Sequence, residues 1–243
     1  MPKLHIFGDS YSTPGYYVEP RDSWWGLVAH DLQNQIDEVV NWSWPGNNID
    51  SIAHIIVSNS EIFRPDDYLI IGIPPLQRLT MFNPDKEIWP KKVLYDQNLL
   101  ERDREDILCH RGLAQYVIHE MDKQYVMLWN PSWIEAQVLR SVILLDSFIS
   151  NQLDCKKFVF LNLSVPFQPL TEWPVLNCLQ KNAYANKRMI LFDNTYYSVN
   201  LEKHQPADFD THGWMGHHGP KGNHHWYESV VKSRITELGW LKN

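Results

Sequence analysis

The stretch KLHIFGDSYS (residues 3–12) decides how the rest of the sequence is interpreted. Its first part, Lys3–Phe7, is a short apolar run that stops at Gly8, a pattern typical of a buried first strand. Gly8 permits a tight turn, and Ser10 then stands where its hydroxyl can face a crevice at the end of the strand. Asp and Ser are also common in turns and caps, so these residues alone leave a structural role open.

Predicted strands and helices alternate along the chain. Further strands are expected at 39–43, Tyr68–Ile73, 157–163 and 189–192, and helices at 23–35, 49–59, 132–153 and 224–238. Asp22 or Ser23 is the expected N-cap of the first helix, and Ser132 that of the third. This alternation predicts a doubly wound, mostly parallel α/β sheet. Residues 76–130 are less regular and are interpreted as an insertion with some helix.

Composition excludes several classes of protein. The chain has 243 residues, 44% of them hydrophobic and 21% charged, which is typical of a globular protein and favours a single domain over residues 1–243. The net charge of −7 (22 − 29) argues against a nucleic-acid partner. No apolar run approaches the ~18 residues of a membrane span. No signal peptide and no CxxC spacing are recognisable, so we expect a cytoplasmic protein without disulfides.

Two later segments carry residues that suit chemistry. The first is WSWPGNN (residues 42–48), which follows the second predicted strand. The backbone N–H of Gly46 could stabilise a developing oxyanion. Alternatively, Pro45 and Gly46 form a simple turn, and Asn47 or Asn48 caps the next helix.

The second segment is DFDTHGWMGHHGPKGNHH (residues 208–225), just before the last predicted helix. An imidazole next to a serine hydroxyl, oriented by a carboxylate, makes a general base, and both residue types are present here. The candidates are Asp208, Asp210, His212, His217 and His218. A polar loop capping the helix is the plainer alternative. A metal site is a third, but the HExxH spacing is lacking, so we predict no metal and no cofactor.

Gly-Asp-Ser, Pro-Gly-Asn and the histidine segment occur in an order that resembles the SGNH (GDSL) hydrolases, a flavodoxin-like α/β family of esterases and lipases. The resemblance implies a three-layer sandwich around a mostly parallel sheet. It also implies that Ser10 is the nucleophile, that His217 is the general base, and that Gly46 donates its N–H to the oxyanion. The residue His217 matches because Gly222 follows it at the family's interval. His218 and His212 remain alternatives.

The chain departs from the family pattern at two positions. Pro74 stands where the family has an oxyanion-donating Asn, and proline has no N–H to donate. Either Asn47, Asn48, Gln77 or Arg78 replaces this donor, or the oxyanion hole is incomplete. Trp214 stands where the family has its Asp. Asp210, or Asp208, must then reach the histidine from further upstream, or the site is a Ser–His dyad.

The resemblance implies a serine esterase that acts on a small-molecule or carbohydrate ester. Trp24, Trp25, Trp42, Trp44 and Trp214 suit sugar stacking and core packing equally. The alternative is an SGNH-like binding or structural protein with weak or no catalysis. Parts of the sequence are similar to SGNH-like proteins encoded by tailed bacteriophages, which implies association with the virion and phage particle proteins as partners. The aromatic content also leaves room for a homo-oligomer.

Overall fold

The computed structural model describes residues 1–14, 18–44, 47–74, 78–83, 86–92, 131–163, 181–183, 185–191, 195–196, 199 and 219–241. Its centre is a five-stranded parallel sheet in the order β2-β1-β3-β6-β7. The strands are β1 (Lys3–Phe7), β2 (Glu38–Asn41), β3 (Tyr68–Ile73), β6 (Lys157–Asn162) and β7 (Met189–Ile190). Strand β1 lies between β2 and β3, so at the carboxyl edge of the sheet the end of β1 is flanked by the ends of these two strands.

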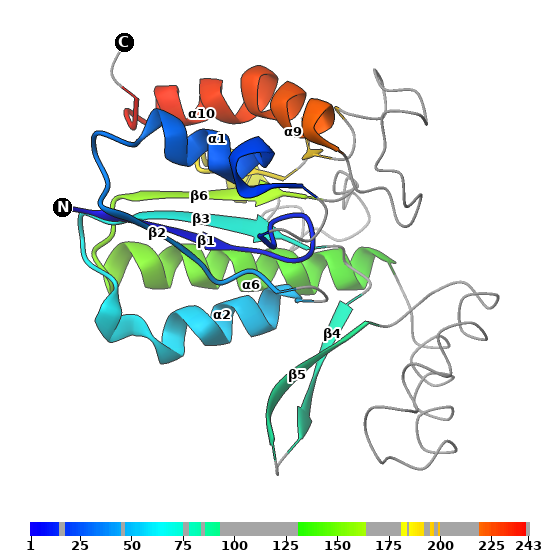
Figure 1. The fold of residues 1–243 in the computed structure, drawn as a ribbon. Helices are drawn as coiled ribbons and strands as arrows, with labels where there is room; N and C mark the ends of the chain where they lie inside the picture. The colour runs from blue at the N-terminus through cyan, green and yellow to red at the C-terminus, as the bar shows by residue number, and fades with distance from the viewer. Residues whose placement is uncertain are drawn as a thin grey trace.

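Helices cover both faces of the sheet (Figure 1). On one face lie α1 (Trp24–Asp31), α9 (Pro220–Trp226) and α10 (Lys232–Glu237), the last two joined by the π-helical turn Tyr227–Val231. On the other face lie α2 (Ile49–Ser58) and α6 (Pro131–Asn151). This confirms the predicted α/β class and the flavodoxin-like three-layer arrangement.

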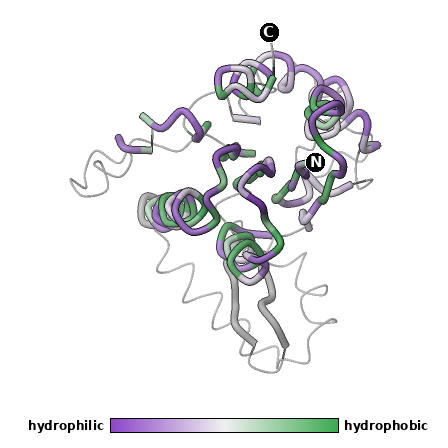
Figure 2. Tube along the Cα trace, turned by 90° about the vertical axis from the view of Figure 1, so that its left-hand side faces the viewer, coloured by the Kyte–Doolittle hydropathy of each residue, from purple (hydrophilic) through white to green (hydrophobic). Residues whose placement is uncertain are grey.

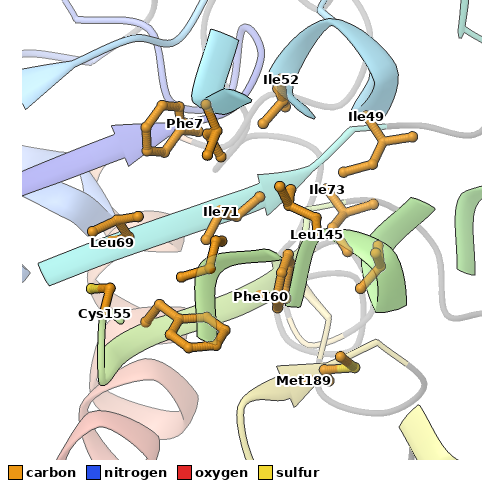
Figure 3. Close-up of a cluster of buried hydrophobic side chains, with 14 of the residues drawn as sticks. Phe7, Ile49, Ile52, Leu69, Ile71, Ile73, Leu145, Cys155, Phe160 and Met189 are labelled. Atoms are coloured by element: carbon orange, nitrogen blue, oxygen red, sulfur yellow. The ribbon is translucent and has the colours of Figure 1, made fainter. Parts of the chain in front are cut away.

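The inner strands β1, β3 and β6 contribute side chains to two hydrophobic cores, one on each face of the sheet. All six residues of β3 are buried. Leu69 and Ile71 point into the core shared with α2 and α6, and Ile70 points into the core shared with α1 and α9. Figure 3 shows the first of these cores, with side chains from strands and helices meeting. Burial on both faces explains why β3 is an unbroken apolar run in the sequence.

The helices bury one stripe each. In α2, Ile49, Ile52 and Ile56 are buried against the sheet, while Val57 is exposed. This spacing places the three isoleucines on one side of the helix. Figure 2 shows hydrophilic and hydrophobic residues alternating around the helices. Amphipathic burial, rather than helix propensity, therefore fixes which way α2 faces.

Several element boundaries differ from the sequence prediction. Ser23 is the N-cap of α1, and its side chain accepts a hydrogen bond from Gly26 N, but α1 ends at Asp31 and not at 35. The third predicted helix begins at Pro131, so Ser132 lies inside it. The last helix begins at Pro220, four residues earlier than predicted. Proline suits the first helical position because its missing N–H would have no partner there.

The insertion predicted at 76–130 contains an antiparallel hairpin that the sequence analysis missed. Its strands are β4 (Arg78–Asn83) and β5 (Lys86–Lys92), and Thr80 pairs with Pro90. Prolines had suggested irregular structure, but a two-stranded hairpin has only edge strands, which tolerate proline. The helix expected in this insertion falls in 93–130, outside the described residues. The single-domain assignment stays a prediction.

A buried polar cluster lies near the amino ends of β1 and β3. The Asp67 carboxylate accepts hydrogen bonds from Lys3 N (2.7 Å) and Arg64 N (2.9 Å), and it lies 3.3 Å from His5 Nε2. The indole Nε1–H of Trp42 donates to His5 Nδ1 at 3.2 Å. Because an indole N–H can only donate, Nδ1 accepts and the ring proton sits on Nε2, facing Asp67. Burial lowers the pKa of His5, in line with this neutral ring.

Within the part of the chain that the structure describes, no helix is both long and apolar enough to cross a membrane.

Candidate functional site

Ser10 lies in the turn that follows β1, at the carboxyl edge of the sheet. The Asp9 side chain accepts a hydrogen bond from Tyr11 N (3.1 Å), and its carbonyl accepts from Ser12 N (2.9 Å) and Thr13 Oγ1 (3.0 Å). Asp9 therefore builds the turn. Ser10 is 8% exposed, so most of the residue is buried in this turn.

Gly8 is required for a different reason from the one predicted. Among the described glycines, only Gly239 has a positive φ, so Gly8 does not supply a left-handed turn. Instead, a Cβ at Gly8 would lie 2.5 Å from Ser12 Oγ and 2.9 Å from Ser12 Cβ. Glycine is needed because the turn folds back against its own strand end.

The loop after β2 is fastened to the Ser10 turn through the Gly8 carbonyl. Trp44 N donates to Gly8 O at 3.3 Å, and Asn47 Nδ2 donates to the same oxygen at 3.0 Å. Asn47 Oδ1 also accepts from Ser51 Oγ at 3.1 Å. The buried Asn47 carboxamide thus ties the first turn of α2 to the Ser10 turn, and its predicted role toward an oxyanion remains a prediction.

Asn48 is the N-cap of α2. Its Oδ1 accepts from Ser51 N (2.9 Å), and its own N–H donates to Ser51 Oγ (3.1 Å), which completes a capping box. This confirms the capping role that the sequence left open between two asparagines. A substrate-binding role for Asn48 remains a prediction, and Pro45 and Gly46 lie outside the described residues.

Asn41 and Ser43 join the same cluster, although the sequence analysis did not select them. Asn41 Nδ2 donates to Ser12 O at 2.8 Å, and Ser43 N donates to Asn41 Oδ1 at 2.8 Å. The hydroxyls of Ser12 and Ser43 are both buried and have no hydrogen-bond partner among the described residues. Short polar residues at the carboxyl end of a parallel strand were the available signal.

The ends of β3 and β6 complete this edge. Pro74 follows β3 and is buried, and its nitrogen carries no proton to donate. Asn162 is the last residue of β6, and its Nδ2 donates to Leu191 O at 2.9 Å. A polar residue ending the apolar run of β6 could have singled it out. Arg78 begins β4, and Gln77 lies outside the described residues.

The predicted base and acid cannot be located. His212, His217, His218, Asp208, Asp210 and Trp214 all lie outside the described residues. The chain is described again from Gly219, which directly precedes α9. Further along α9, His224 is half-exposed, and its Nε2 lies 3.9 Å from Asp22 Oδ1. This is a surface contact.

Other chemistries find little support in the described part of the chain. Burial raises the pKa of the Cys155 thiol to about 11, and its Sγ donates to Asp67 O at 3.2 Å. A protonated, buried thiol is a poor nucleophile. No group of three His, Cys, Asp or Glu side chains suited to a metal ion occurs among the described residues.

The tryptophans noted in the sequence differ in burial. Trp24 and Trp25 are buried in the core under α1, and Trp42 stacks on Phe7 with 6.2 Å between ring centroids. Trp44 is different, because 68% of it is exposed although its backbone is bonded to Gly8. Trp214 lies outside the described residues.

Solved structures similar to this chain include two esterases and a lipolytic protein. A psychrotrophic esterase from Pseudoalteromonas sp. is 10% identical, with 98% of this chain and 100% of that chain covered and a TM-score of 0.50. An acetylxylan esterase from Geobacillus stearothermophilus is 14% identical over 100% and 97% of the two chains, with a TM-score of 0.48. A lipolytic G-D-S-L family protein from Veillonella parvula is 13% identical over 96% and 97%, with a TM-score of 0.45.

The chain has the fold of the Pseudoalteromonas esterase. No family model and no curated protein matches the sequence. At this identity, the structural similarity shows the flavodoxin-like SGNH fold, and the function must be argued from the site.

Proposed function

We propose that this chain is a serine ester hydrolase with Ser10 as its nucleophile. The observation that carries the proposal is the position of Ser10. It lies in a turn braced by Asp9 at the carboxyl end of the inner strand β1, at the sheet edge where ligands bind in open parallel sheets. The fold shared with an esterase supports the same reaction class.

The reaction follows the chemistry of covalent serine catalysis. Ser10 Oγ attacks the ester carbonyl, and its proton passes to His217, whose ring Asp210 orients. The backbone N–H groups of Ser10 and Gly46 stabilise the tetrahedral oxyanion. The protonated imidazole returns the proton to the leaving alcohol, and water then releases the acid from the acyl-enzyme. His218, His212 and Asp208 are the alternative partners.

An exposed indole next to this site favours a carbohydrate ester as the substrate. The backbone of Trp44 is bonded to Gly8 O, two residues from Ser10, and its side chain is 68% exposed. An exposed aromatic ring is a suitable platform for the apolar face of a sugar. We therefore propose an O-acyl group on a carbohydrate as the ester, with the indole contacting the sugar.

A binding protein without catalysis is the second candidate function. Pro74 has no proton to donate at the end of β3, and the Asn47 and Asn48 side chains hold the loop after β2 and the start of α2. Losing one oxyanion donor costs about 10²–10³ in rate. In this version the chain is an SGNH-like binding or structural protein and a component of a phage particle. Self-association, cytoplasmic location and virion association all stay predictions.

Labelling with a fluorophosphonate, followed by intact mass, tests the first proposal. The probe resembles the inhibitor of the Pseudoalteromonas esterase, which is inhibited by monoethylphosphonate. We expect one adduct on the wild type, none on Ser10→Ala, and an unchanged adduct on Ser12→Ala. Ser12 is the matched control because it is a buried serine of the same turn.

An adduct that persists in Ser10→Ala would show that another residue is the nucleophile. Absence of an adduct on the folded wild type would contradict the hydrolase and favour the binding protein.

A further inference from the structure

Asn223, a buried residue of α9, connects two segments that are far apart in the sequence. Its Oδ1 accepts a hydrogen bond from Trp24 N at 3.0 Å, across 199 residues of chain. Its Nδ2 donates to Gly219 O at 3.1 Å. A single carboxamide therefore joins the first residue of α1 to the residue that precedes α9.

The bond from Trp24 N to Asn223 Oδ1 satisfies a backbone N–H at the start of helix α1. The first N–H groups of a helix have no partner within it. Ser23 Oγ accepts from Gly26 N at 3.1 Å, so the cap serves that donor and not Trp24 N. Asn223 supplies the acceptor that Trp24 N needs, and it does so from another helix.

Trp24 extends the connection to the Ser10 turn. Its indole Nε1–H donates to Tyr11 O at 3.2 Å, and Tyr11 directly follows Ser10. Trp24 is fully buried, so both of its N–H groups are bonded away from water. Three hydrogen bonds thus run from Tyr11 O through Trp24 and Asn223 to Gly219 O.

A row of aromatic rings packs alongside these hydrogen bonds and connects the same two segments. The ring of Tyr11 contacts Tyr196 at 5.4 Å between centroids, Tyr196 contacts Trp226 at 5.0 Å, and Trp226 contacts Trp24 at 5.6 Å. All three contacts are edge-to-face, the geometry that aromatic pairs prefer. The Ser10 turn and the start of α9 are therefore held by packing as well as by hydrogen bonds.

We infer that Asn223 is a positioning residue for the reaction proposed above, and this inference rests on that proposed function. Gly219 directly follows His218 and stands two residues after His217. By fixing Gly219 O to the Ser10 turn, Asn223 sets the end point of the segment that carries the proposed general base. A base that is misplaced by about 1 Å costs on the order of 10²-fold in rate.

The chemistry of the link requires an amide. Asn223→Asp is nearly the same shape and keeps an acceptor for Trp24 N. It loses the donor to Gly219 O, however, and sets a carboxylate against that carbonyl. Asn223→Ala loses both side-chain bonds. In either variant, the backbone N–H of residue 223, which is 3.2 Å from Gly219 O in the wild type, can still donate to that oxygen. The two variants together separate the loss of the Gly219 bond from the loss of the whole link.

A matched control exists at the other end of the same helical layer. Gln35 Nε2 donates to Trp240 O at 3.0 Å, and Gln35 Oε1 accepts from Tyr68 OH at 3.0 Å. Gln35 therefore also joins the segment after α1 to the segment after α10 through one carboxamide. It does so near the amino end of β3, away from Ser10. Gln35→Ala removes a link of the same kind without touching the Ser10 turn.

The experiment measures kcat and KM for 4-nitrophenyl acetate, and the rate of fluorophosphonate labelling, in the full chain. We expect Asn223→Ala and Asn223→Asp to lower kcat and the labelling rate about 10–100-fold, with KM within about twofold. Gln35→Ala should keep kcat within about twofold of the wild type. Thermal unfolding of each variant reports whether it is folded at the assay temperature.

If folded Asn223→Asp keeps the kcat of Gln35→Ala while the wild type is labelled at Ser10, the positioning role is overturned and the proposed hydrolase stands. If Asn223→Ala does not fold, the Asn223→Asp result decides. A wild type that is neither labelled nor active overturns both proposals.

Discussion

The two ends of the central sheet are built from different kinds of residue. At the amino end, large and charged side chains bond to each other. Lys157 Nζ donates to Tyr68 OH at 2.9 Å, Tyr68 OH donates to Gln35, and Asp67 lies beside His5. At the carboxyl end, short side chains such as Asn41 bond to backbone groups, and glycine allows close approach.

This difference indicates that the amino end of the sheet chiefly stabilises the fold, whereas the carboxyl end carries the residues suited to chemistry. Removing one partner of a buried, charged pair is strongly destabilising, so substitutions at the amino end should lower the free energy of unfolding. The carboxyl end holds a serine turn, two buried hydroxyls without partners among the described residues, and an exposed indole. We therefore expect substitutions at the amino end to affect chiefly the free energy of unfolding, whereas substitutions that displace the Ser10 turn at the carboxyl end should also lower the rate.

The largest effect is expected from Asp67→Ala. This change leaves Lys3 N, Arg64 N and His5 without their buried acceptor, and breaking such a set costs about 3–5 kcal/mol of unfolding free energy. Urea unfolding measures it, and labelling of Ser10 per folded molecule should be unchanged. Arg64→Ala is the control, because its half-exposed side chain contributes less than about 1 kcal/mol. If Asp67→Ala lost no more unfolding free energy than Arg64→Ala, the proposed stabilising role of the amino end would be contradicted.

Gly8→Ala tests the carboxyl end. The added Cβ would lie 2.5 Å from Ser12 Oγ, so the turn must shift. We expect kcat for 4-nitrophenyl acetate to fall about 10–100-fold, with an overpacking loss of about 1–3 kcal/mol in urea unfolding.

Gly239→Ala is the control for Gly8→Ala, since its φ of 74° strains alanine while open space surrounds it. It should cost about 1–2 kcal/mol and leave kcat unchanged. Equal kcat in the two variants would contradict the prediction.

His5 should make stability depend on pH. Burial lowers the pKa of folded His5, so below pH ~6.5 the unfolded chain binds a proton that the folded chain does not. Unfolding free energy therefore falls as pH falls below ~6.5, until the pH reaches the lowered pKa, with a slope of up to about 1.4 kcal/mol per pH unit. Asp67, Lys3 and Glu38 are the charged groups that act on this ring.

The measurement for His5 compares urea unfolding of the wild type and His5→Gln between pH 7.5 and 5.5. Other histidines titrate in both proteins, so the difference reports His5. The unfolding free energy of the wild type should fall relative to that of His5→Gln as the pH falls from 7.5 to 5.5. Parallel pH profiles would show that His5 does not contribute.

The smallest effect is expected from Trp44→Ala. Loss of the exposed ring should raise KM for an O-acetylated oligosaccharide about 3–10-fold, the size of one aromatic contact. KM for 4-nitrophenyl acetate and the unfolding free energy should stay unchanged. Trp44→Phe should restore most of the affinity. Equal changes for both esters would remove the argument for a sugar.

Local patterns allowed much of this fold to be predicted. The apolar run of Lys3–Phe7 and the following Gly8 were enough to place Ser10 after the first strand, and α2 was predicted to within one residue. The hairpin at 78–92 was missed because its prolines resemble loop signals. The capping roles of Ser23 and Asn48 were each narrowed to two residues, since neighbours of similar chemistry satisfy the same local rule.

The sequence by itself determined the alternation of strands and helices, the serine after β1, and the missing donor at Pro74. These follow from hydrophobic periodicity and from the chemistry of single residues, which act over a few positions. Only the tertiary structure decided that Asn223 bonds to Trp24 and that Trp44 is exposed while Trp24 is buried. A contact across 199 residues leaves no local pattern, because it exists only once two helices pack on the same face of the sheet.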